Sequence, residues 1–141
     1  MHKVETLGRH ILVEYYNCDP EVLKDPELIE QSMNQAALEA KATIVDSVVH
    51  HFNPWGVSGA VIVAESHLTI HTWPEYGFAS ADFFTCGEID PWKSFEYLET
   101  ILKSEFSESI EIPRGLTSKI QKHSKNDLGL ITHKPIEAAA V

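Results

Sequence analysis

The stretch AESHLTIHTWPEYGFASADFFTCG, residues 64–87, decides the fold of this chain. Apolar and polar residues alternate along 67–73, and a period of two is typical of a strand with one buried face. The sequence PEYG at 74–77 interrupts the run, and a second strand is expected along 78–86. Two short strands joined by a tight turn predict antiparallel pairing. The first strand would carry Leu68 and Ile70 on one face and His67, Thr69, His71 and Trp73 on the other.

The segments around this hairpin predict further strands and two helices. Asp25-Pro26 and Asp90-Pro91 each place a capping carboxylate before a proline, which is typical of the first turn of a helix. Apolar residues then follow at helical spacing and mark a face that packs on a sheet. We therefore predict an α+β fold, a two-layer sandwich in which helices cover one face of an antiparallel β-sheet. The further strands are expected over 9–16, 43–52, 59–64, which reads as buried on both faces, and 109–113.

Length and composition narrow the class of protein. The chain has 141 residues, 43% of them hydrophobic, so we expect a single domain over 1–141, with the tail after about residue 114 loosely assigned. There are 11 basic and 21 acidic residues, and the net charge of -10 leaves no basic stripe for nucleic acid. Two cysteines are too few for a disulfide framework, and no apolar run approaches the roughly 20 residues that cross a membrane. These features predict a soluble cytoplasmic protein that binds neither nucleic acid nor membrane.

The hairpin stretch also carries an unusual number of reactive side chains. An imidazole such as that of His71 can accept a proton near neutral pH, whereas a thiol such as that of Cys86 is mostly protonated and can donate one. The alternative is structural, with His71 closing a hydrogen bond and Cys86 packing as a small apolar residue. Histidines on neighbouring strands also suit a zinc site, although no carboxylate or thiol at close spacing completes the ligand set. These histidines are His50, His51, His67 and His71.

The motif ESHLTIHTWPEYG, followed by a strand that ends in FFTCG, resembles the self-cleavage segment of prokaryotic S-adenosylmethionine decarboxylase proenzymes of the short type. Other segments resemble the same family in the same order, and together they span roughly residues 6–104. They are GRH, LIEQSMNQAALEAKATIV, FNPWGVSG and DPWKSFEYL. Because the central motif is highly specific, the resemblance implies a self-processing decarboxylase that acts on S-adenosylmethionine.

The resemblance implies that the chain makes its own cofactor. In this family the peptide bond before the serine rearranges to an ester, which here means that Ser66 Oγ attacks the carbonyl of Glu65. Strain of about 1–3 kcal/mol at the turn would assist the attack. His71 would then remove the Cα proton of Ser66, and Ser58 in the GVSG turn resembles the hydroxyl that assists the rearrangement. The chain would break between Glu65 and Ser66 and leave a covalent pyruvoyl group at position 66.

The same resemblance assigns the decarboxylation step. The pyruvoyl ketone would form a Schiff base with the substrate amine and accept electrons as carbon dioxide leaves. Cys86 resembles the residue that donates a proton to the product, decarboxylated S-adenosylmethionine, which supplies aminopropyl groups for spermidine synthesis. Phe52 and Trp73 resemble aromatic residues of the substrate pocket, with Phe52 stacked on adenine, and Glu75 resembles the carboxylate that binds the ribose. The family further implies a homodimer with active sites at the subunit interface.

Two other functions fit parts of the sequence. Related proteins with the same fold and a pyruvoyl group decarboxylate arginine or ornithine, but a bare amino acid offers neither adenine to Phe52 nor ribose to Glu75. In the second alternative the chain is a non-catalytic protein, Ser66 never cleaves, and the histidines hold a metal. Asp82 has no assigned role, and burial on the sheet face is the simplest expectation for it.

Overall fold

One antiparallel sheet organises the fold, and the computed structural model describes it over residues 5–125 and 136–137. Six of its seven strands follow in the order β2-β3-β4-β5-β1-β6, and β7 pairs with the start of β1. All of the paired strands run antiparallel. The strands are β1 (Glu5–Tyr16), β2 (Ile44–His51), β3 (Val57–Val63), β4 (Ser66–Trp73), β5 (Phe78–Thr85), β6 (Phe106–Leu116) and β7 (Ile136–Glu137).

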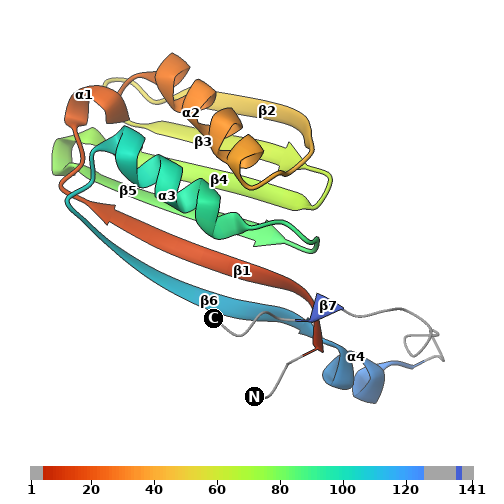
Figure 1. Ribbon diagram of the computed structural model, residues 1–141. Helices are drawn as coiled ribbons and strands as arrows, with labels where there is room; N and C mark the ends of the chain where they lie inside the picture. The colour runs from red at the N-terminus through yellow and green to blue at the C-terminus, as the bar shows by residue number, and fades with distance from the viewer. Residues whose placement is uncertain (1–4, 126–135, 138–141) are drawn as a thin grey trace.

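Three helices lie on the same face of the sheet, as Figure 1 shows, and no described helix covers the opposite face, which we call the open face. They are α1 (Pro20–Leu23), α2 (Pro26–Glu39) and α3 (Pro91–Leu102). A short α4 (Thr117–His123) follows β6, and a 3-10 turn, η1 (Pro74–Tyr76), joins β4 to β5. The prediction of a two-layer α+β sandwich with helices on one face of an antiparallel sheet is confirmed.

Both predicted capping residues start their helices. The Asp25 carboxylate accepts a hydrogen bond from the Leu28 N–H at 3.1 Å, and the Asp90 carboxylate accepts one from the Trp92 N–H at 3.1 Å. Each bond satisfies a backbone donor that has no partner inside the helix. A proline follows each cap, so α2 and α3 begin at the residues that the sequence predicted.

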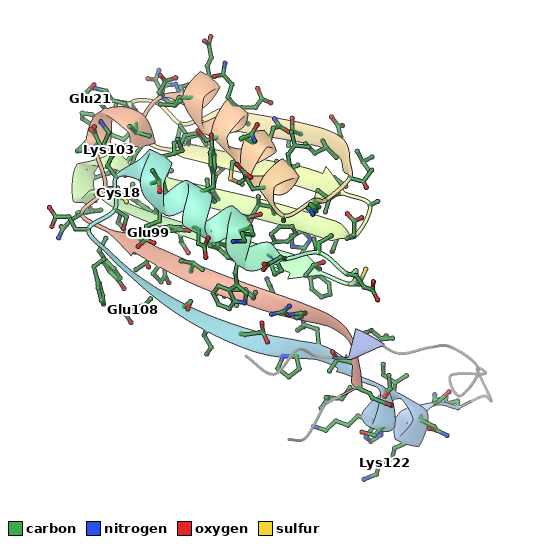
Figure 2. The ribbon with its side chains drawn as sticks, viewed as in Figure 1. Cys18, Glu21, Glu99, Lys103, Glu108 and Lys122 are labelled. Atoms are coloured by element: carbon green, nitrogen blue, oxygen red, sulfur yellow. The ribbon has the colours of Figure 1, made fainter. Side chains whose placement is uncertain are left out.

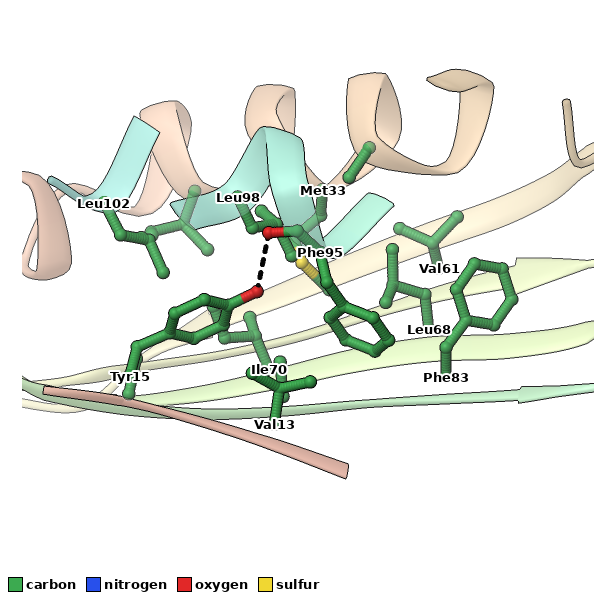
Figure 3. Close-up of a cluster of buried hydrophobic side chains, with 14 of the residues drawn as sticks. Val13, Tyr15, Met33, Val61, Leu68, Ile70, Phe83, Phe95, Leu98 and Leu102 are labelled. Atoms are coloured by element: carbon green, nitrogen blue, oxygen red, sulfur yellow. Dashed lines mark hydrogen bonds between the residues drawn. The ribbon is translucent and has the colours of Figure 1, made fainter. Parts of the chain in front are cut away.

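The core lies between the helices and the covered face of the sheet (Figure 3). It is almost entirely apolar, and its one buried tyrosine hydroxyl, that of Tyr15, donates to the Phe95 carbonyl at 2.9 Å and so links β1 to α3. Burial raises the pKa of Tyr15 well above its ordinary value, so the hydroxyl stays protonated and keeps this hydrogen bond. Large side chains that are fully buried include Ile11, Leu23, Ile29, Met33, Leu68, Phe83, Leu98 and Leu102.

One strand differs from its prediction. The stretch 59–64 was expected to be buried on both faces, but β3 alternates between buried and more exposed residues. Val61 and Val63 pack in the core, whereas 46% of Ile62 is exposed on the open face. The prediction was wrong because a two-layer sandwich covers only one side of the sheet, even under a run of apolar residues.

Pairing between β1 and β6 extends both strands beyond their predicted bounds. The register runs from Thr6 opposite Leu116 to Tyr16 opposite Phe106, so β6 is longer than the stretch 109–113. Figure 2 shows Glu108 of β6 on the side of the sheet away from the helices. In the predicted loose tail after residue 114, residues 115–125 and 136–137 are described and include the end of β6, α4 and β7, and the rest lies outside the described residues. Within the part of the chain that is described, no helix has the length and apolar character needed to span a membrane.

Candidate active site

β4 carries the polar side chains of the hairpin motif to the open face. Leu68 and Ile70 are buried in the core, and the predicted alternation along this strand is confirmed. The intervening side chains, those of His67, Thr69, His71 and Trp73, are each partly exposed on the open face. The reactive groups of the motif therefore lie on an uncovered sheet surface and not in a sheet interior.

The turn between β3 and β4 contains the Glu65–Ser66 peptide bond. Val63 pairs with Ser66, so Ala64 and Glu65 form the turn and Ser66 is the first residue of β4. Ser66 has a φ of 149°, a value that residues with a side chain rarely adopt. Backbone conformations of this kind cost about 1–3 kcal/mol and cluster at functional sites. The strain expected at this turn thus lies on the serine itself.

The carbonyl oxygen of Glu65 accepts two hydrogen bonds from Cys86. The Cys86 backbone N–H donates at 2.8 Å and the Cys86 thiol donates at 3.0 Å. Ser66 pairs with Thr85 across β4 and β5, and this register brings the next residue, Cys86, against the turn. Two donors aimed at one carbonyl oxygen stabilise the negative charge that forms when the carbonyl carbon is attacked.

The Glu65 side chain is held in place from two directions. Its carboxylate accepts a hydrogen bond from the Thr43 N–H at 3.1 Å. On the other side Gly87 approaches so closely that a Cβ at this position would lie 2.6 Å from Glu65 Cγ. A residue larger than glycine at position 87 would therefore force the Glu65 side chain to move.

The two cysteines have different environments. Cys18 is buried, and burial raises the pKa of its thiol to about 11. It therefore stays protonated and packs in the core. Cys86 is exposed and lies at the reactive turn, so only Cys86 can exchange a proton with a ligand there.

A second group of predicted residues surrounds His71. Ser58 of β3 lies opposite His71 of β4, and Ser58 Oγ shares a hydrogen bond with His71 Nδ1. The Trp73 ring centroid lies 4.4 Å and the Phe52 ring centroid 5.7 Å from that of the His71 ring. Glu75 is exposed on η1, directly after β4. The structure thus brings the predicted base His71, the predicted hydroxyl of Ser58 and the aromatic residues together at one end of β4.

The two groups of residues lie at opposite ends of the same strand. Ser66 is the first residue of β4, and His71 follows it by five positions. At about 3.3 Å per residue, their Cα atoms are about 16 Å apart. Within one chain, therefore, Ser66 and Cys86 meet each other, but neither meets His71.

Asp82 forms a polar cluster that the sequence did not predict. On the open face, it accepts a hydrogen bond from Thr69 Oγ1, and its Oδ2 lies 2.5 Å from His10 Nε2 and 3.7 Å from His67 Nε2. Among described residues, His10, His67 and Asp82 are the one group of three potential ligands close enough to share a metal ion. The predicted four-histidine alternative does not form, because His67 joins this group. The Asp82 cluster depends on the pairing of β1 with β5, and a prediction of that pairing from the sequence could have revealed the cluster.

Substitution of Ser66 tests the backbone strain. Ser66→Gly allows a φ of 149° without strain, whereas Ser66→Ala keeps the strained backbone, and both remove the hydroxyl. We expect the glycine variant to have a free energy of unfolding about 1 kcal/mol higher than that of the alanine variant, measured by urea denaturation. An alanine variant of equal or greater stability would contradict the strain.

Comparisons with known proteins agree on one family. The family model described as S-adenosylmethionine decarboxylase matches residues 9–115. The S-adenosylmethionine decarboxylase proenzyme of Thermotoga petrophila is 56% identical over 118 residues, which cover 83% of this chain and 91% of that protein. The proenzyme of the same name from Caldicellulosiruptor saccharolyticus is 51% identical over 114 residues, which cover 80% and 92%.

A solved structure extends the likeness to the fold. The crystal structure of the adenosylmethionine decarboxylase from Aquifex aeolicus matches with a TM-score of 0.73 at 35% sequence identity. The match covers 79% of this chain and 92% of that chain. The family model includes both groups of site residues, from Phe52 to Cys86. This chain belongs to the S-adenosylmethionine decarboxylase family.

Proposed function

We propose that this chain is a self-processing decarboxylase that converts S-adenosylmethionine to decarboxylated S-adenosylmethionine and carbon dioxide. The product would supply aminopropyl groups for spermidine synthesis. The observation that carries the proposal is the pair of donors that Cys86 directs at the Glu65 carbonyl, beside the strained Ser66. A peptide carbonyl held in this way is prepared for attack by the neighbouring hydroxyl.

Processing would begin at the Glu65–Ser66 bond. Ser66 Oγ attacks the Glu65 carbonyl carbon, and the Cys86 N–H and thiol stabilise the charge that develops on the oxygen. Collapse of this species breaks the peptide C–N bond and leaves an ester. Loss of the Cα proton of Ser66 then releases the Glu65 carboxylate. The dehydroalanine that remains at position 66 tautomerises to an imine, and water hydrolyses the imine to release ammonia and leave the pyruvoyl group.

The base for the Cα proton would come from a second copy of the chain. His71 is the proposed base, but in its own chain it lies about 16 Å from Ser66 along β4. A homodimer in which the open faces meet in opposite directions would place His71 of the partner subunit at this serine. Ser58 of the partner subunit would arrive with it, because the two side chains share a hydrogen bond. Each active site would then combine the two groups.

The open face has the composition of an interface. Four aromatic rings form a row across it, with centroid separations of 5.4 Å for Trp73–Phe78, 5.4 Å for Phe78–Tyr16 and 5.6 Å for Tyr16–Phe106. Large apolar side chains on β2, β3 and β6 are also exposed, among them Val48, Ile62 and Ile110. Apolar surface of this extent on one face is typical of a site of association.

The residues near Ser66 and the residues near His71 would have different roles in decarboxylation. The pyruvoyl group, when present, supplies the electron sink that allows the carboxyl carbon to leave. The exposed Cys86 thiol lies beside the Glu65–Ser66 turn and would donate a proton to the substrate carbon from which carbon dioxide has left. Phe52 would stack on adenine beside Trp73, and the exposed Glu75 carboxylate would accept hydrogen bonds from the ribose. In the dimer these binding residues would come from the subunit that supplies His71.

The alternatives have less support. The relatives are named for S-adenosylmethionine, and neither arginine nor ornithine has an adenine or a ribose for Phe52 and Glu75 to bind. A positive charge beside the potential metal ligands His10, His67 and Asp82 argues against a metal-binding protein. The Arg114 Nη1 donor lies 2.9 Å from His10 Nδ1, and so places a positive charge beside the would-be ligand.

A substrate panel tests the proposed activity. Purified wild-type protein is expected to release labelled carbon dioxide from carboxyl-labelled S-adenosylmethionine, and not from labelled arginine or ornithine. Ser66→Ala is expected to stay a single uncleaved chain and to release none, because it has no nucleophile to form the cofactor. Equal release from arginine or ornithine would contradict the substrate, and full activity of Ser66→Ala would contradict the cofactor.

Mixed dimers test the shared site. Ser66→Ala and His71→Ala chains, each with a different tag, should remain uncleaved when each is expressed alone. When they are co-expressed, the His71→Ala chain should be cleaved, because its Ser66 meets His71 of the partner subunit. The Ser66→Ala/His71→Ala double variant is the matched control and should not rescue cleavage. The shared site would be wrong if the His71→Ala chain stayed intact in isolated mixed dimers, or was cleaved at the wild-type rate when alone.

A further inference from the structure

The cluster around Asp82 continues to the proposed cleavage site. Asp82 lies on the open face of β5 and accepts a hydrogen bond on Oδ1 from Thr69. Its other oxygen faces the imidazoles of His10 and His67. His67 follows Ser66 in the chain, and its Nδ1 lies 3.5 Å from Ser66 Oγ. The Asp82 carboxylate therefore contacts the His67 imidazole, and the His67 imidazole contacts the Ser66 hydroxyl.

The partners of His10 determine where its proton lies. Arginine has only donors, so Arg114 Nη1 must donate to His10 Nδ1 across 2.9 Å. A neutral His10 then carries its proton on Nε2 and donates it to Asp82 across 2.5 Å. The Arg114 guanidinium is itself held 5.2 Å from the centre of the Phe84 ring. In this arrangement Asp82 accepts the hydrogen bond, and His10 has no lone pair left for a metal ion.

The Asp82 charge in turn orients His67. His67 Nε2 lies 3.7 Å from Asp82 Oδ2, and the negative carboxylate favours the tautomer with the proton on that nitrogen. The lone pair is then on Nδ1, the atom that faces Ser66 Oγ. The ring is positioned by edge contacts to Phe84 at 5.7 Å and to His10 at 6.2 Å between centroids. The same division of roles, with a carboxylate fixing the tautomer of a base, occurs in Ser-His-Asp sites.

We propose that His67 is the base that accepts the Ser66 Oγ proton in the first step of processing, and that Asp82 is its positioning residue. The inference rests on the proposed self-cleavage. The proton passes from Ser66 Oγ to His67 Nδ1 as the bond from Oγ to the Glu65 carbonyl carbon forms. When the C–N bond breaks, the same proton passes from His67 to the departing amine nitrogen of Ser66. The ester is an isomer of the peptide, so no other reactant is needed.

This assignment gives the two histidines different steps. His67 serves the hydroxyl of Ser66 within its own chain, whereas His71 of the partner subunit serves the Cα proton after the ester has formed. The contacts of 3.5 Å and 3.7 Å are longer than ideal hydrogen bonds. Catalytic hydrogen bonds are often long before the reaction and commonly tighten only when it proceeds.

The first test follows ester formation separately from chain cleavage. Freshly translated full-length chains are quenched in denaturant at intervals and treated with hydroxylamine, which cleaves an ester and marks Glu65 as a hydroxamate. His71→Ala should accumulate the ester. In His67→Gln, the rate of ester formation should be about 100-fold lower than the rate of processing in wild type, because a positioned base contributes a factor of this size. His123→Gln on the exposed end of α4 is the matched control and should process at the wild-type rate.

Each outcome for His67→Gln has a defined meaning. Cleavage within about threefold of the wild-type rate would overturn the proposal, since a base contributes much more. Accumulation of ester in this variant would also overturn it, because His67 would then act after the first step. If wild type itself does not cleave before residue 66, the proposed function fails. If wild type cleaves and His67→Gln cleaves normally, only the assignment of His67 as the base fails.

Asp82→Asn provides a second test that does not depend on the folding of the His67 variant. A positioning residue for His67 should slow ester formation by at least about tenfold and leave the rate at which accumulated ester breaks down unchanged. A purely structural role would slow both steps equally, and that result would overturn the assignment of Asp82. Far-UV circular dichroism of both variants verifies the fold, and if His67→Gln is unfolded, the Asp82→Asn result decides.

Discussion

The register between β4 and β5 is the constraint on which the rest of the site depends. Ser66 pairs with Thr85, and this pairing alone brings both Cys86 donors to the Glu65 carbonyl. The register is enforced from the other side of the sheet, where Leu68 and Phe83 are fully buried. A slip by one residue would turn these side chains to the open face and their polar neighbours into the core. The packing of the core therefore fixes the geometry at the peptide bond.

The uncovered side of the sheet explains why charged and reactive groups can lie on strands. Asp82, His10 and Arg114 would be costly beneath a second layer of helices, because buried charges need complete pairing. On the open face they remain partly exposed and also partner one another. Because these groups pair with one another, the proposed dimer would cover this face without leaving their charges unpaired, and it would join groups that lie about 16 Å apart within one chain. Processing and substrate binding would then both depend on association.

Much of the fold follows from local patterns in the sequence. The alternation along 67–73 gave the buried face of β4, and the carboxylates of Asp25 and Asp90 gave the starts of two helices, because each signal acts within a few residues. Burial of β3 was predicted wrongly because an apolar run cannot show how many layers cover a sheet. The proposed roles of His71 and Cys86 came from resemblance, whereas the Asp82 cluster depends on pairing between distant strands. The length of β4 could have been counted from the sequence, and it already separates Ser66 from His71.

The proposed processing converts the Glu65–Ser66 bond, beside the strained Ser66 backbone, to an ester and then to a pyruvoyl terminus. Intact mass of purified wild-type protein under denaturing conditions tests it most directly. Two chains are expected, one that ends at Glu65 with a free carboxylate and one that begins at residue 66. The second chain should be lighter, by the conversion of its terminal serine to a pyruvoyl group, than a chain released by simple hydrolysis. A single full-length mass, or a second chain that begins with an unmodified serine, would contradict this processing.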